Sequence, residues 1–148
     1  MHFEAKVYVG CSLTYAPQEF RDSVEQLKIK LAEVCQVLSF KGLSDGNLPY
    51  DVYKHDIIDC VYQCDLMAAI CDYPSTGLGW EMATQTEKRG KPLIAAGHKD
   101  SKISKLIMDP QLPEYEFWRY ESMEELLQLI MRKVLSLERS RRHAHIDS

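Results

Sequence analysis

A short, wholly apolar run at residues 66–71 (LMAAIC) constrains the fold of this chain more than any other feature. Asp65 and Asp72 bound the run, so it is far too short to span a bilayer and has no polar side to turn toward water. A strand of this kind must be covered on both faces, as the inner strands of parallel sheets are. The run therefore predicts a sheet with helices on both sides.

Segments of strand and helix character alternate along the rest of the chain. Apolar residues spaced three or four apart predict helices at residues 17–35, 51–63, 80–89, 101–108 and 122–137. Strands are predicted at residues 5–10, 36–40, 66–71, 93–96 and 115–120, and a loop at residues 41–50. This alternation favours an α/β protein with a three-layer flavodoxin-like (Rossmann-like) fold and a five-stranded parallel sheet.

Length and composition exclude several classes of protein. The 148 residues fit one domain at residues 1–138, followed by a polar tail at residues 139–148 that we expect to be disordered. A formal charge of -4 argues against binding to long nucleic acid. The first residues lack the pattern of a signal peptide, and five cysteines without a CxxC pair favour reduced thiols and no metal site. We expect a cytoplasmic protein that does not enter membranes.

The densest chemical signal is the segment at residues 72–81 (DYPSTGLGWE), between the buried strand and a helix start. Gly77 and Gly79 would let the backbone approach a ligand closely, and the free amides of a first helical turn attract negative charge. Glu81 in that turn would be kept ionised by the helix dipole, as a nucleophile must be. The same pattern is also ordinary helix capping, so on these residues alone both interpretations stay open.

The same segment is the most specific part of a family resemblance. PSTGLGWEMA (residues 74–83) resembles the P-S-x-G-x-G-[YW]-E-[LM]-[GA] signature of the nucleoside 2-deoxyribosyltransferase family. It is closest to the 2'-deoxynucleoside 5'-phosphate N-hydrolase branch. Further segments are similar to that branch in the same order, namely VYVGCS, KHDIIDCVYQCDLMAAI, GKPLIA and EFWRYESMEELL. The resemblance therefore covers about residues 5–135.

The resemblance implies roles for two acids. Glu81 would attack the anomeric carbon of a nucleoside and form a glycosyl ester, which water or a second base then resolves. Asp56 would be the partner acid that orients Glu81 or protonates the base. Asp56 stands one residue farther from Asp65 than is usual in the family. Either a helix irregularity accounts for this spacing, or Asp59 is the acid instead.

The resemblance also implies a set of binding residues. These are Tyr8, Gly10, Ser12, Ser75, Gly77 and Gly79. Ser104 resembles a serine that a second subunit lends to the site, which implies a homodimer or higher homo-oligomer, although a helix-start hydroxyl would look the same. Thr14 and Cys11 stand where the hydrolase branch has arginine and glycine. Because a guanidinium clamps a phosphate better than a hydroxyl does, the need for a 5'-phosphate stays open.

The function that these features predict is cleavage of the N-glycosidic bond of a (2'-deoxy)nucleoside or its 5'-monophosphate, releasing the free base. No metal or organic cofactor is expected, because the carboxylates carry the reaction. A deoxyribosyltransferase that exchanges bases is one alternative, and the lack of a carboxamide-containing terminal segment tilts the choice toward the hydrolase. A noncatalytic nucleotide-binding module of the same fold is the other alternative.

Overall fold

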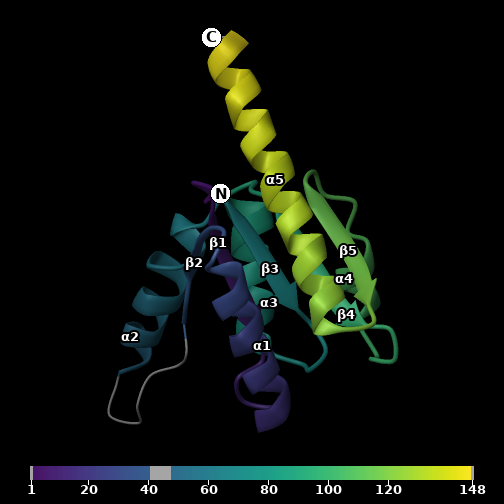
Figure 1. Ribbon diagram of the computed structural model, residues 1–148. Coiled ribbons are helices and arrows are strands. Elements are labelled where there is room, and N and C mark those ends of the chain that lie inside the picture. The colour runs from purple at the N-terminus through teal and green to yellow at the C-terminus, as the bar shows by residue number, and fades with distance from the viewer. Residues whose placement is uncertain (1, 41–47, 148) are drawn as a thin grey trace.

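The structure is a computed structural model and describes residues 2–40 and 48–147. Its centre is a five-stranded sheet with all neighbours parallel, in the order β2-β1-β3-β4-β5 (Figure 1). The strands are β1 (Lys6–Cys11), β2 (Gln36–Leu38), β3 (Leu66–Ile70), β4 (Leu93–His98) and β5 (Tyr115–Tyr120). This order confirms the flavodoxin-like α/β fold and the five strands that the sequence predicts.

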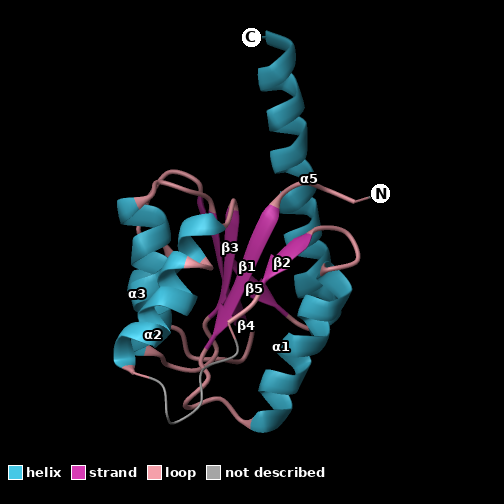
Figure 2. Ribbon diagram, turned by 90° about the vertical axis from the view of Figure 1, so that its left-hand side faces the viewer, coloured by secondary structure: helices cyan, strands magenta, loops and turns pink. Residues whose placement is uncertain are grey.

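Helices cover both faces of this sheet (Figure 2). On one face lie α1 (Gln18–Leu31) and α5 (Met123–Asp147), and on the other lie α2 (Pro49–Tyr53) and α3 (Thr76–Ala83). Two π-helical segments, η1 (Lys54–Ile58) and η3 (Thr84–Lys88), continue α2 and α3. A 3₁₀ turn, η2 (Val61–Gln63), leads into β3, and α4 (Lys105–Met108) precedes β5. None of the helices in the described part of the chain is long and apolar enough to cross a membrane.

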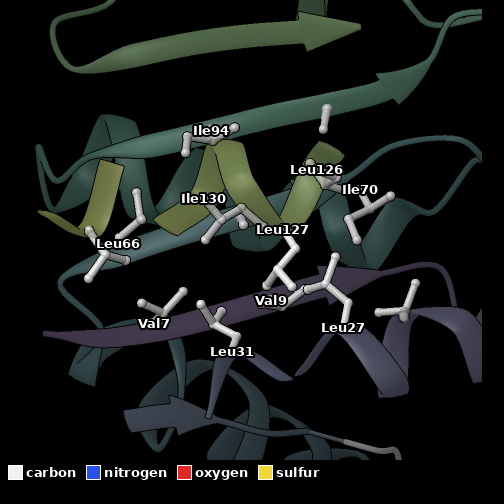
Figure 3. Packing of buried hydrophobic residues seen from close by; sticks show 14 of the residues in the cluster. Val7, Val9, Leu27, Leu31, Leu66, Ile70, Ile94, Leu126, Leu127 and Ile130 are labelled. Carbon is white, nitrogen blue, oxygen red and sulfur yellow. The ribbon is translucent and has the colours of Figure 1, made fainter. Parts of the chain in front are cut away.

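Two hydrophobic cores lie on the two faces of the sheet. Between the sheet and α1 and α5 pack Val7, Val9, Leu27, Leu31, Leu66, Ile70, Ile94, Leu126, Leu127 and Ile130 (Figure 3). Successive side chains of a strand point to opposite faces, so Tyr8, between two valines of this core, faces α2 and α3 instead. All five residues of β3 are buried, which confirms the double cover that its apolar run requires. The alternation thus places the buried side chain of Tyr8 on the second face.

The helix that the sequence predicts at residues 80–89 begins earlier, at Thr76. Its start is set by Ser75, whose Oγ accepts a hydrogen bond from the amide of Leu78 at 3.1 Å. A serine that caps in this way satisfies one of the free amides of the first turn. Gly77 and Gly79 therefore lie within the helix rather than in a loop before it.

Of the polar tail expected at residues 139–148, the described residues 139–147 are helical, because α5 continues to Asp147. Two contacts tie this part of α5 to the strands. The buried carboxyl group of Glu138 accepts a hydrogen bond from the amide of Ala5 at 2.7 Å, and Arg141 pairs with Asp65 at 2.6 Å. Of the loop expected at residues 41–50, residues 41–47 lie outside the described residues.

Glu138→Ala should lower the free energy of unfolding by about 1–3 kcal/mol, because it leaves the buried amide of Ala5 without its acceptor. Urea unfolding of the whole chain measures this loss. Gln128→Ala changes an exposed side chain of the same helix and should cost less than about 0.5 kcal/mol. Equal losses in the two variants would show that the contact with Ala5 does not stabilise α5.

Candidate active site

Tyr8 brings together side chains from two helices. Its ring is buried, with 3% of its surface exposed, on the face of β1 that α2 and α3 cover. The phenol oxygen lies 3.0 Å from Oδ1 of Asp56 and is also hydrogen-bonded to Oε1 of Glu81. Burial first, and then the two acids, raise the pKa of the phenol above its ordinary value, so the hydroxyl stays a donor. One hydroxyl thus joins two acids that are far apart in the sequence.

Asp56 reaches this position from the π-helical segment η1. The amide of Asp59 donates to the carbonyl of Lys54 at 3.0 Å, a bond one residue longer than that of an α-helix. A helix irregularity, one of the two explanations left open for the spacing of Asp56, is therefore present. Asp59, the alternative acid, is half exposed and pairs with His55 at 3.2 Å. The structure therefore places Asp56, and not Asp59, against the tyrosine.

Glu81 lies in the second turn of α3, because the helix begins at Thr76. Its side chain points into the protein and has only 5% of its surface exposed. The expectation that the helix dipole keeps this carboxyl ionised is wrong. Burial, followed by the hydrogen bond and charge of Asp56, raises the pKa of Glu81 to about 9. In the free protein, the pair of acids therefore keeps a proton at neutral pH.

These groups line one cavity of about 230 Å³ at the carboxyl ends of the strands. The order of the strands reverses there, since β1 lies between β2 and β3, and ligands of open α/β sheets collect at such a point. Of the predicted site residues, the cavity brings together Tyr8, Gly10, Asp56, Ser75, Gly77 and Glu81. A larger cavity of about 480 Å³ lies between the start of the chain and α5, and its lining includes none of these residues.

Gly10 and Ser75 have packing roles as well as a place in the cavity. A Cβ atom at Gly10 would lie 3.0 Å from Cδ1 of Leu78, so the missing side chain lets α3 approach β1. Ser75 lines the cavity and also caps α3. For Ser75, the capping interpretation is confirmed, and it leaves the side chain at the edge of the cavity.

Three predicted residues lie outside the lining of this cavity. Ser12 is buried, and its Oγ accepts a hydrogen bond from the amide of Tyr15 at 3.2 Å, which shapes the loop after β1. Gly79 is exposed on α3 with open space where a Cβ would lie. Ser104 is exposed at the start of α4. Within this chain, none of the three lines the cavity that holds the acids.

Several residues of the lining carry no functional signal of their own in the sequence, namely Leu13, Lys28, Phe40 and Val52. Lys28 is the unexpected one, since a lysine on an amphipathic helix normally lies in solvent, and this one has 6% of its surface exposed. Its position does give a hint. Lys28 follows Val24 by four residues and Leu27 by one, which places it within the apolar stripe of α1.

The fold and these groups define an α/β protein of flavodoxin-like topology with a phenol and two acids in a cavity at its strand ends. A phenol and two carboxyl groups in contact suit acid-base or nucleophilic chemistry on a small molecule. The described residues hold no group of three or more His, Cys, Asp or Glu side chains that could bind a metal.

Comparison with solved structures finds a protein of the same fold. The chain is similar to the CMP N-glycosidase BcmB of Clostridium botulinum, with a TM-score of 0.65, 21% identity, and 84% of this chain and 97% of that chain covered. A 2-desoxiribosyltransferase from Leishmania mexicana gives a TM-score of 0.47 at 14% identity, covering 64% of this chain and 65% of that one. No protein-family model and no curated protein matches the sequence. The first similarity confirms the predicted three-layer fold.

Glu81→Gln should stabilise the fold, and the gain should grow with pH. The pKa of Glu81 is about 9 in the folded protein and 4.5 ordinarily, so between these values the folded state binds the extra proton and wild-type stability falls as pH rises. A glutamine carries no such proton. Thermal unfolding of both proteins between about pH 5 and pH 9 measures the difference.

Glu87→Gln is the matched control for this experiment, because Glu87 is exposed on η3 shortly after Glu81. It should leave the dependence of Tm on pH unchanged. A difference between Glu81→Gln and wild type that is the same at every pH would show that Glu81 ionises normally in the folded protein.

Proposed function

We propose that this protein cleaves the N-glycosidic bond of a (2'-deoxy)nucleoside or its 5'-monophosphate and releases the free base. The observation that carries the proposal is the hydroxyl of Tyr8 held between the carboxyl groups of Asp56 and Glu81 in one cavity. The fold shared with a CMP N-glycosidase supports the same class of reaction. The resemblance of residues 74–83 to deoxyribosyltransferases supports Glu81 as the nucleophile.

In the first step, an oxygen of Glu81 bonds to C1' of the sugar while the bond from C1' to the base breaks. The electron pair of that bond leaves with the base, which needs a proton to depart readily. Water then adds to the glycosyl ester, releases the sugar and returns Glu81. Tyr8 holds the carboxyl group in place by its hydrogen bond throughout.

The raised pKa of Glu81 fits this sequence of steps if its proton moves to Asp56 when substrate binds. The transfer produces an ionised nucleophile and a protonated acid at once. Asp56 then gives the proton to the leaving base, and the water that hydrolyses the ester restores a proton to Glu81. The pair thus stores in the free protein the proton that the base requires.

The rest of the substrate would lie toward the start of α3. Ser75 and Gly77 line the cavity there, where free amides of the helix favour a phosphate or a sugar hydroxyl. Thr14 lines the same cavity in place of the arginine of the hydrolase branch, so a hydroxyl rather than a guanidinium would meet a 5'-phosphate. Because Ser104 is exposed and remote within its own chain, it would act only in the site of a second copy, as in a homodimer.

Wild-type protein incubated with a panel of nucleosides and 5'-monophosphates should release free base, which chromatography measures. Glu81→Ala should lower kcat/KM by about 10³-fold or more, because it removes the attacking atom. Glu87→Ala, at an exposed position close by, should leave it unchanged. Adding a second base separates the alternatives, since exchange of bases would indicate a transferase. Absence of any base release would favour a noncatalytic binding module.

The pH profile tests the stored proton. On a cytosine or adenine substrate, whose base does not ionise at alkaline pH, kcat/KM should fall as pH rises through about 9, where the acid pair loses its proton. Asp56→Asn should lower the maximal rate by about 10²- to 10⁴-fold and abolish this alkaline fall. Asp59→Asn, at the exposed neighbouring acid, is the control. Activity that rises through pH 9 in wild type would overturn the proton transfer.

A further inference from the structure

Lys28 enters the cavity from the opposite layer of the molecule. It belongs to α1, which packs on the face of the sheet away from α2 and α3 (Figure 2). Even so, it lines the cavity that holds Asp56 and Glu81, and only 6% of its surface is exposed. A lysine that is almost fully buried in the lining of a cavity with two acids is a functional candidate in its own right, since lysines are seldom buried to this extent.

Lys28 can reach the cavity because the strand β2 is short. The register pairs β2 with β1 as far as Tyr8 and Leu38, whereas β1 continues along β3 to Cys11. Lys28 and Phe40 line the cavity on this β2 side of β1. Ser75 and Gly77 come after β3 and therefore lie on the other side of β1. The cavity thus has two ends, one lined by Lys28 and Phe40 and the other by Ser75 and Gly77.

The chemistry of the two ends differs. An ammonium group has three donors, and among the described residues Lys28 donates one hydrogen bond, to Oε1 of Glu25 at 3.0 Å. Its positive charge also acts inside the cavity, where it lowers the pKa of both Glu81 and Cys11 against the larger effect of burial. Phe40 adds an aromatic side chain to this end, on which a flat ring can stack.

We propose that Lys28 binds the ring carbonyl next to the glycosidic nitrogen of a pyrimidine base and neutralises the charge that gathers there as the bond to C1' breaks. This inference rests on the proposed function and narrows its substrate class to pyrimidine nucleosides or nucleotides. The electron pair of the broken bond spreads from N1 onto the carbonyl oxygen, and Lys28 donates a hydrogen bond to it without losing its own proton. The base receives its final proton from Asp56.

A neutral base fits this end better than a phosphate does. Glu25 lies against the ammonium group, so a dianion bound by Lys28 would meet a carboxylate a few ångströms away. A carbonyl oxygen that is charged only in the transition state avoids that repulsion. The hydrogen bond from Lys28 to this oxygen is strongest in the transition state, and a contact of this kind raises kcat.

Lys28→Met tests the proposal, because methionine keeps much of the length and none of the charge. On a uracil nucleotide, kcat should fall by about 10²-fold. On the 5-fluorouracil analogue, whose base leaves more readily, the loss should be several-fold smaller. Lys28→Arg should recover part of the rate. Lys30→Met, at an exposed lysine of the same helix, is the control and should have no effect.

Other outcomes would overturn the proposal. If Lys28→Met weakened only the binding of nucleotides and left nucleoside turnover intact, the phosphate rather than the base would lie at Lys28. Equal losses on uracil and 5-fluorouracil substrates, accompanied by a lower Tm, would show that Lys28 only supports the walls of the cavity. If the wild type also turned over purine substrates, and Lys28→Met lowered that rate as much as the rate on uracil substrates, a role for the pyrimidine carbonyl would be contradicted.

A binding experiment separates failure of this inference from failure of the proposed function. In a Glu81→Gln background, which cannot turn over, calorimetry with deoxyuridine measures affinity alone. Adding Lys28→Met should weaken that affinity about tenfold, since one charged hydrogen bond is lost. If the wild-type protein released no base but Lys28→Met still weakened the affinity for deoxyuridine, the proposed reaction would be rejected and base recognition by Lys28 would be kept. Unchanged affinity together with unchanged kcat would reject the role of Lys28.

Discussion

The hydrogen bonds of Tyr8 with Asp56 and Glu81 impose the strictest condition on the structure. Three polar groups meet there largely out of contact with water, and each comes from a different element, β1, η1 and α3. A buried pair of acids is tolerable only when a proton and hydrogen bonds neutralise it. The parallel sheet makes these hydrogen bonds possible, because it brings β1 and the helix that follows β3 together at one edge.

The backbone adapts to this contact where the two helices carry their acids. A π-turn in η1 inserts one extra residue, and the resulting rotation presents Asp56 to the sheet while Asp59 stays at the surface. A second π-helical segment, η3, continues the helix that carries Glu81. Burying Glu81 with a raised pKa costs stability at neutral pH, and such a cost is typical of residues kept for function.

The features that sequence reasoning predicted correctly are those that local patterns determine. The apolar run of β3 specifies a covered strand, and alternation along the chain specifies the parallel sheet. The protonation of Glu81 depends on its burial and on Asp56, which are tertiary contacts that no local pattern records. The start of α3 and the π-turn at Asp56 did leave local signals, in the capping residue Ser75 and in the spacing between Asp56 and Asp65. Lys28 lies within the apolar stripe of α1, but its place in the cavity depends on how α1 packs against the sheet, which the stripe alone does not show.

The sequence left capping and catalysis as alternatives at residues 72–81, and in the structure the cap and the proposed nucleophile are different residues of this segment. Ser75 caps α3, and this sets the helix start so that Glu81 falls one turn later, away from the free amides and against β1. Away from the helix start the dipole acts weakly, and burial, followed by Asp56, raises the pKa of Glu81 instead. An acid pair that holds one proton can supply both a nucleophile and a proton for the leaving base, which a permanently ionised glutamate cannot.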